Sequence, residues 1–326
     1  MSLIIRPNAG FIIPTRRFVE AALKPSAVGM SGRYQLIVRD AWGVEKRRTP
    51  WFDNIILDSG LNRWGTGGCI AGAAIGTGTS TPVASQTGLD TQSHWTTTPG
   101  AGNGVSSALG SSPYNNTYTA VYRTTPGALN GNYSEVGVGW ASGSMFSRAL
   151  VLDGGGSPTT ISVSSSEQLD IVYQLSIFPP LVDTSATVTI SGVDYAVTGR
   201  GMLVNSITTG GWQPSSIQTA VGVGSWPSAG FFSGSIGAIT SSPSGGSGGL
   251  AGSGSLALIG GYSNNSLTRA MRYTADLNYG NPSGGVKSSN ALWSFCSFQY
   301  EFNPVIPKNN TKTLTLDFSV TWARRP

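Results

Sequence analysis

Alternation of apolar and polar residues with a period of two is the feature that most limits how this chain folds. Between residues 168 and 178 (QLDIVYQLSIF), every second position holds leucine, isoleucine or tyrosine, from Leu169 to Ile177. Successive side chains of a strand point to opposite sides of a sheet, so this spacing predicts a half-buried β-strand. Residues 186–198 and 311–322 alternate in the same way, and each segment predicts a closing hairpin.

Helical periodicity is nearly absent from the sequence. The best candidate is residues 15–24 (TRRFVEAALK), which Pro14 and Pro25 bracket. The 45 glycines, together with many serine, threonine and asparagine residues, instead suit short strands joined by turns. Trp42 and Gly43 separate two such strands and predict a hairpin. Because no helix of crossover length separates the strands, the sequence predicts an all-β antiparallel sandwich rather than a parallel α/β fold.

Five short motifs occur twice in the same order. The clearest pair is SRAL at 147–150 and TRAM at 268–271. Five collinear matches predict that one β-rich unit has been duplicated. The other four pairs are a glycine and an aromatic at 139–140 and 261–262, FPPL and FNPV at 178–181 and 302–305, TSATVTIS and NTKTLTLDFS at 184–191 and 310–319, and VTGR and VTWAR at 197–200 and 320–324.

The duplication predicts two similar β-sandwich units in tandem after an N-terminal arm. The matched arginines, Arg148 and Arg269, each precede an alanine in an apolar strand. An unpaired charge is costly to bury, so we expect each arginine to pair with an acid or with backbone carbonyls at a sandwich edge. The predicted parts are the arm at 1–32, a first unit at 33–200 with a long Gly/Ser/Thr-rich loop at 60–115, and a second unit at 201–326 with a flexible loop at 241–255.

The positive charge of the chain is concentrated near its start. The formal net charge is +5, yet residues 1–48 hold nine basic and three acidic side chains. Prolines and aromatic residues interrupt these charges, which favours docking on an acidic protein neighbour over binding nucleic acid. The sequence therefore predicts an extended basic arm that acts as a tether, through Arg6, Arg16, Arg17 and Lys24.

Residues that could carry catalysis are scarce. The single histidine, His94, has no nucleophile or orienting acid near it in the sequence, and sparse carboxylates disfavour glycoside hydrolysis. Structural zinc needs about four ligands, whereas the chain has one histidine and the cysteines Cys69 and Cys296. Gly-x-Gly pairs at 76–78 and 222–224 are predicted to be turn glycines. We expect no enzymatic activity, no metal, no cofactor, no secretory signal and no membrane span.

Four tryptophans lie beside glycine, serine, threonine or glutamine in segments predicted to be loops. Such residues can stack on sugar rings, or they can be buried where subunits meet. We favour the subunit contact and keep the sugar site as the alternative. The four are Trp64, Trp95, Trp212 and Trp226.

Four stretches of the sequence resemble structural proteins of tailed bacteriophage virions, in the group described as tail, tail-fibre or minor tail components. The resemblance covers most of residues 33–200 and the C-terminus, and no catalytic motif accompanies it. The stretches are WFDNIILDSGLNRWG (51–65), AIGTGTSTPVASQTGLDT (74–91), FSRALVLDGGGSPTTISVSSSEQLDIVYQLSIFPP (146–180) and PVIPKNNTKTLTLDFSVTWAR (304–324).

This resemblance implies a place in a virion rather than a reaction. The chain would be made in the bacterial cytoplasm and would assemble as a homo-oligomer with tail tube, collar, baseplate or fibre subunits. The alternative is a receptor-binding tail tip that holds a host surface polysaccharide. A capsid decoration protein and a polysaccharide depolymerase are more distant alternatives.

Overall fold

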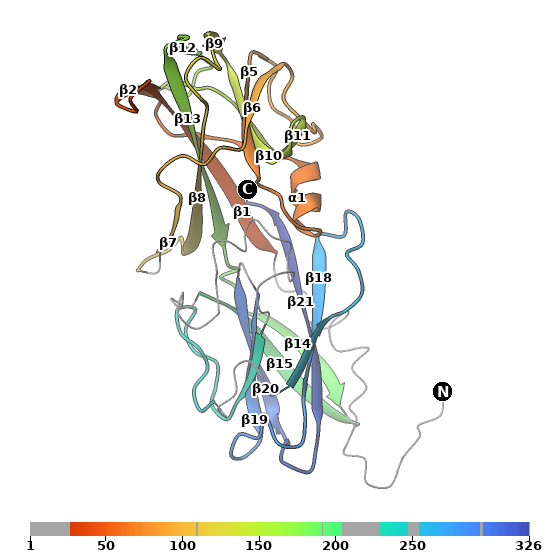
Figure 1. The fold of residues 1–326 in the computed structure, drawn as a ribbon. Coiled ribbons are helices and arrows are strands. Elements are labelled where there is room, and N and C mark those ends of the chain that lie inside the picture. Colours follow the sequence, from red (N-terminus) through yellow and green to blue (C-terminus); the bar gives the residue numbers. More distant parts are fainter. Residues whose placement is uncertain are drawn as a thin grey trace.

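The computed structural model describes residues 27–108, 110–190, 192–203, 228–246, 254–293 and 296–325. Within these ranges the fold is all-β, and its one helix is α1 (Asp58–Trp64). The strands build two units that lie end to end in an elongated molecule (Figure 1). The predicted β-sandwich class is thus confirmed. The predicted helix at 15–24 lies outside the described residues.

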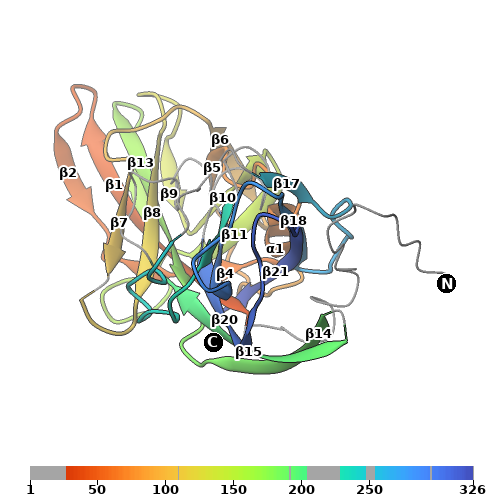
Figure 2. The same ribbon diagram turned by 90° about the horizontal axis from the view of Figure 1, so that it is seen from below.

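Two facing sheets form the first unit. Tyr34 and Tyr173 in one sheet contact Phe146 and Ser147 in the other, and the Tyr34 hydroxyl shares a 2.6 Å hydrogen bond with the Ser147 hydroxyl. Figure 2, which looks along the molecule, separates β1, β8 and β13 from β5, β6 and β10. The first sheet contains β1 (Val28–Asp40), β13 (Glu167–Phe178), β8 (Asn115–Arg123) and β7 (Gly104–Ala108), with β2 (Glu45–Arg48) and β3 (Phe52–Asp53) also paired to β1. The second runs β4 (Ile55–Ile56), β11 (Ser144–Leu150), β10 (Glu135–Ala141), β5 (Gly72–Gly76) and β6 (Gln92–Thr96).

The predicted period-two strand is β13, and it is central to the first sheet. Every second residue from Leu169 to Ile177 is at most 1% exposed. The predicted hairpin at Trp42 and Gly43 is also present, because β2 turns back on β1 with a register shift after Val38. Two further strands, β9 (Gly131–Tyr133) and β12 (Ile161–Val163), pair with each other at the outer end of this unit.

The second unit combines strands from both halves of the sequence. Tyr300 packs on Phe318 and Phe231 on Tyr273, with ring centroids 5.4 Å apart in each pair. These contacts join the two layers across an aromatic core. One layer is β14 (Thr184–Ile190), β15 (Val193–Met202), β20 (Ser297–Ile306), β19 (Val286–Leu292) and β16 (Ser228–Phe232). The other is β17 (Gly254–Leu258), β18 (Thr268–Ala275) and β21 (Leu314–Arg324).

Strand β21 belongs to both units. It pairs with β18 in the second unit, and near its end it pairs in parallel with β1 of the first unit, with Val28 opposite Trp322 and Met30 opposite Arg324. A single nine-stranded sheet therefore crosses the boundary between the units. Backbone hydrogen bonds, rather than a linker alone, hold the two units together.

This pairing corrects the domain division expected from the sequence. Strands β14 and β15 were expected to close the first unit, but β15 pairs with β20, with Val197 opposite Phe302. The division between the units therefore falls between β13 and β14 rather than at residue 200. The arm is also shorter than the predicted 1–32, because Val28 and Met30 are buried members of β1.

The structure also changes what the repeated motifs mean. Residues 311–322 do not form a hairpin, because they enter the single long strand β21. Of their counterparts, residues 184–190 and 197–200 lie on the two strands of the β14–β15 hairpin. The closing motifs thus occupy different kinds of structure in the two halves, and the duplication stays a prediction.

The expected loop at 60–115 contains part of α1 and the strands β5, β6 and β7. Most of the expected loop at 241–255 lies outside the described residues.

Candidate functional site

The most deeply buried charge cluster surrounds Arg148, one of the two matched arginines. Arg148 on β11 and Glu135 on β10 have fully buried side chains. The Arg148 Nε donates to Glu135 at 3.0 Å, and its Nη2 donates to Asp90 at 2.6 Å and to the Ser80 carbonyl at 3.2 Å. Arg148 therefore has both kinds of partner expected from the sequence. It lies within a sheet, however, and not at an edge.

Glu135 anchors the segment 77–91 that crosses this arginine. Its carboxylate accepts backbone N–H groups from Gly78 at 2.9 Å, Asp90 at 3.0 Å and Thr91 at 2.7 Å. Hydrogen bonding from Ser80, aided by the Arg148 guanidinium, lowers the pKa of Asp90. Because buried charges need compensating partners, these bonds make the segment an ordered part of the unit.

Gly76 and Gly78 are required here for space, not for a turn. A Cβ at Gly76 would lie 2.6 Å from the Glu135 Oε1, and a Cβ at Gly78 would lie 2.5 Å from the same atom. Neither residue has the positive φ that turn glycines adopt. The prediction of turn glycines was therefore wrong at 76–78, while 222–224 lies outside the described residues.

Arg269, the second matched arginine, has different surroundings. It lies on β18 opposite Val320 and is 8% exposed. Burial lowers its pKa, and the neighbouring Tyr262 opposes that effect. Glu135 lies on the strand next to Arg148, opposite Leu150. The matching position on β21, opposite Met271, is Phe318, which carries no charge.

The structure separates the four tryptophans that were grouped as loop aromatics. Trp64 is fully buried in α1, where its ring meets Phe146 edge-on, so it is a core residue and not a surface loop residue. Trp95 lies on β6, half-buried against Leu57, Ala74 and Met145. Trp212 and Trp226 lie outside the described residues.

Two tryptophans outside the predicted group of four, Trp42 and Trp51, are more exposed. Trp42 is 88% exposed at the tip of the β1–β2 hairpin. The Asp40 carboxylate holds this tip by accepting the backbone N–H groups of Trp42 at 3.1 Å and Val44 at 2.9 Å. Trp51 is 36% exposed, and the Arg33 guanidinium lies 4.6 Å from its ring centroid. The Asp-Ala-Trp-Gly turn at 40–43 was the available signal for Trp42.

The remaining predicted residues show no catalytic arrangement among the described ones. His94 is half-buried on β6, and burial lowers its pKa. Cys69 and Cys296 are both buried thiols, and burial raises the pKa of Cys69 to about 12. In the described ranges no group of three or more His, Cys, Asp or Glu side chains could hold a metal ion. The arm residues Arg6, Arg16, Arg17 and Lys24 lie outside the described part of the chain.

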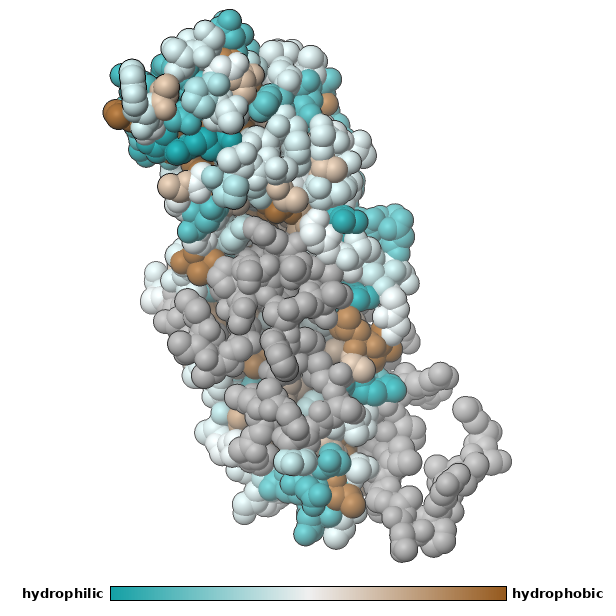
Figure 3. Space-filling model, viewed as in Figure 1, coloured by the Kyte–Doolittle hydropathy of each residue, from teal (hydrophilic) through white to brown (hydrophobic). Residues whose placement is uncertain are grey.

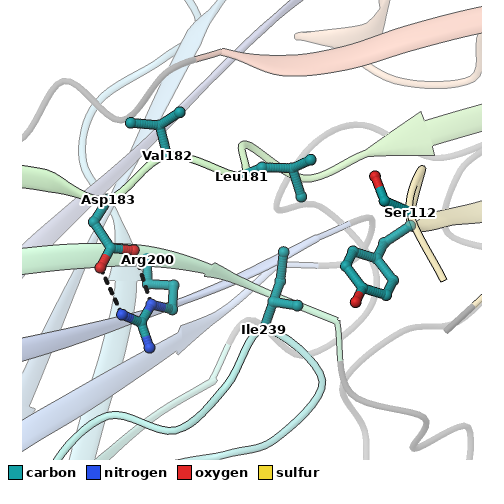
Figure 4. Close-up of a pocket in the computed structure, with 7 residues that line it drawn as sticks. Ser112, Leu181, Val182, Asp183, Arg200 and Ile239 are labelled. Carbon is teal, nitrogen blue, oxygen red and sulfur yellow. Dashed lines mark hydrogen bonds and ion pairs between the residues drawn. The ribbon is translucent and has the colours of Figure 1, made fainter. Parts of the chain in front are cut away.

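An open cavity of about 610 Å³ lies where the two units meet. Leu181 and Val182, which are 55% and 72% exposed, border it from the connection between β13 and β14 (Figure 4). Arg200 on β15 closes one side by donating to both oxygens of Asp183, at 2.8 and 2.6 Å, and this pairing lowers the pKa of Asp183. The charges at this cavity are thus paired with each other, while the apolar side chains face solvent.

A second cavity, of about 580 Å³, lies at the far end of the second unit. It borders Lys308, which is 3% exposed. The Lys308 ammonium donates to the carbonyls of Asp276 at 2.8 Å and Tyr279 at 2.9 Å, to the side-chain oxygen of Asn281 and to the Asn309 carbonyl. Burial lowers the pKa of Lys308. All donors of this lysine hold two loops together, so the lysine has a structural role.

The face of the molecule in Figure 3 carries small, separate apolar patches on its described residues. In Figure 3 the coloured atoms show isolated brown areas between pale and teal ones. A surface of this kind suits polar contacts more than one continuous apolar interface. None of the helices in the described ranges is both long enough and apolar enough to cross a lipid bilayer.

Comparison with known proteins gives no relative. No protein-family model, no curated protein and no solved structure matches this chain.

Proposed function

We propose that this chain is a structural component of a tailed-phage virion, a tail, tail-fibre or connector protein that acts by assembly. The sequence resemblance described above supports the proposal. The structural observation that carries it is the nine-stranded sheet that crosses both units through the pairing of β1 and β21. A sheet shared in this way suits a protein whose work is to hold its neighbours at a set distance and angle.

Assembly would use the basic N-terminal segment and a polar body. The described strands begin at Val28, so the segment that can serve as a tether is 1–26. Its four cationic side chains would dock on an acidic or carbonyl-rich surface of a neighbouring subunit. The body would contribute hydrogen-bonded, hydrated contacts of the kind that large assemblies use, including contacts between copies of this chain.

The proposal is tested by locating the chain in particles. Immunogold electron microscopy of purified virions is expected to label one site on the tail or its connector. A chain that lacks residues 1–26 is expected to fold, with the circular dichroism of a β protein, but to be missing from particles on immunoblots. Unlabelled particles would overturn the virion proposal. Normal incorporation of the shortened chain would overturn the tether alone.

A receptor-binding tail tip is the second candidate, and the exposure of Trp42 favours it. An indole that is 88% exposed at a hairpin tip held by Asp40 is available to an external ligand. If this candidate holds, replacing Trp42 by alanine leaves particles normal in appearance and protein content but lowers their adsorption to host cells. Unchanged adsorption would remove the support that Trp42 gives.

A further inference from the structure

The outer face of β1 carries an arginine that differs from its neighbours in the same sheet. Arg39 and Arg123 pair with Asp170, Arg47 pairs with Glu167, and Arg48 pairs with Glu45. Arg33 is exposed on the same sheet and forms no ion pair with any described carboxylate. No bonded acid among the described residues therefore neutralises its positive charge.

Neutral groups hold the Arg33 side chain in place. Its Nε donates to the Gln174 side-chain oxygen at 2.8 Å, and its guanidinium lies 4.6 Å from the centroid of the Trp51 ring. Gln174 in turn donates to the Thr119 hydroxyl at 3.2 Å. The four groups thus form a connected row from the β3 side of the sheet across β1 and β13 to β8. Because Trp51 and Gln174 restrict the guanidinium, little side-chain entropy remains to be lost when a ligand binds.

The donors that remain on Arg33 define the chemistry of a ligand. The two terminal nitrogens of its guanidinium have no acceptor among the described residues. A guanidinium fork of this kind matches the two oxygens of a carboxylate. The indole of Trp51 beside it is 36% exposed and offers apolar area, while Gln174 and Thr119 offer hydrogen bonds to hydroxyl groups.

We propose that Arg33, Trp51, Gln174 and Thr119 bind a carboxylate-bearing sugar residue of a polysaccharide. Arg33 would hold the carboxylate, Trp51 would lie against the sugar ring, and Gln174 and Thr119 would bond to hydroxyl groups. A hydroxyl-rich ligand fits this row better than an acidic peptide, because the amide and hydroxyl partners extend away from the single cation. This inference does not depend on the place of the chain in a virion.

Asp53 supplies an internal check on this site. It lies directly opposite Arg33 in the pairing of β3 with β1, so the two side chains share one face of the sheet. It forms no ion pair with Arg33. A negative charge at this position repels a ligand carboxylate. Replacing Asp53 by asparagine should therefore strengthen binding of an acidic sugar and leave binding of a neutral one unchanged.

Isothermal titration calorimetry on the full chain tests the proposal with hexamers of galacturonate and of mannuronate. Maltohexaose serves as the neutral probe and hexaglutamate as the acidic peptide. At least one uronate hexamer is expected to bind, with an affinity that falls as salt rises. Arg33→Gln and Trp51→Ala are each expected to weaken binding about tenfold or more, and Asp53→Asn to strengthen it about threefold. The matched control Arg48→Gln, which removes an exposed and paired arginine, is expected to change affinity less than about twofold.

Four results would overturn the proposal. The first is no binding of either uronate hexamer at about 10 mM, which is weaker than specific recognition requires. The second is equal binding of maltohexaose, because the carboxylate would then have no role. The third is equal Arg33-dependent binding of hexaglutamate, which would make the site a general anion site. The fourth is uronate binding that Arg33→Gln leaves unchanged while circular dichroism shows an intact fold.

Discussion

The indole nitrogen of Trp322 donates a 2.9 Å hydrogen bond to the carbonyl oxygen of Leu61, and this bond links the last strand of the chain to helix α1 of the first unit. Trp322 is 1% exposed, and the Tyr262 ring stacks on it at 6.0 Å. Nearby, Arg324 pairs with Asp58. The boundary between the units is therefore packed like an interior, and we expect the two units to unfold together.

Replacing Trp322 by alanine tests this coupling. Loss of a buried indole should lower the free energy of unfolding by about 3–5 kcal/mol. Trp322→Phe keeps most of the packing but leaves the Leu61 carbonyl without its partner, at a cost of about 1–3 kcal/mol. Urea denaturation followed by circular dichroism measures both. Trp42→Ala is the control, because that side chain is 88% exposed. If the Trp322→Ala protein is as stable as this control, the boundary between the two units is not packed as part of the core.

The buried pair of Arg148 and Glu135 leads to a second prediction. Arg148→Met leaves the buried Glu135 carboxylate without its cation and should cost about 3–5 kcal/mol. Glu135→Gln leaves the guanidinium with only the Asp90 carboxylate, so its cost should be somewhat smaller. In the double variant neither charge remains. Its loss of stability should therefore be smaller than the sum of the two single losses. A double-mutant cycle in urea measures the coupling, and strict additivity would mean that the two groups do not depend on each other.

Gly78 should not tolerate a methyl group. The added Cβ would lie 2.4 Å from the Asp90 Cβ and 2.5 Å from the Glu135 Oε1. We expect Gly78→Ala to lower stability by about 1–3 kcal/mol, through displacement of segment 77–91. Gly104→Ala is the matched control, because its Cβ would meet no atom within 4 Å. Equal melting temperatures for the two variants would contradict the close approach that the structure shows.

The pair of Arg47 and Glu167 should make stability depend on pH. Hydrogen bonding from Arg47, followed by bonding from Ser164, lowers the pKa of Glu167 from 4.5 to about 2. A depressed carboxyl pKa stabilises the fold above the unfolded value of 4.5, and this contribution is lost as the pH falls toward 2. Arg47→Gln should therefore lower the melting temperature most at neutral pH, and the difference from the unchanged protein should shrink below about pH 4.5. A difference that stays constant from pH 7 to pH 2.5 would show that Arg47 does not lower this pKa.

The class of fold could be predicted because it depends on local patterns. The alternation from Leu169 to Ile177 is a local pattern, and the face of β13 that it predicts to be buried lies in the core. The hairpin at Trp42 depends equally on neighbouring residues. Strand partners were harder to predict. The pairing of Val28 with Trp322 joins the two ends of the sequence, and nothing local to either residue indicates it.

The candidate sites could be predicted only in part, for the same reason. A buried arginine needs a partner, so a partner for Arg148 was predictable, but its identity as Glu135 depends on the register of β10 with β11. Trp64 was predicted to lie in a loop because glycines surround it in the sequence. In the structure it belongs to helix α1, and its ring packs against Phe146. The row from Trp51 to Thr119 combines four separate segments, so only the folded sheet reveals it.

The pairing of β1 with β21 also decides where the described chain leaves the fold. The Arg325 backbone N–H donates to the Met30 carbonyl at 2.8 Å, so both ends of the described chain lie side by side near the middle of the molecule (Figure 1). Attachment through either end would therefore hold the protein near the middle of its length. The two units would then extend from the attachment point in opposite directions. A force on one unit would rotate the protein about the attachment point rather than stretch it. The largest displacement would occur at the far ends of the two units, which are the hairpin tip at Trp42 and the loops at Lys308.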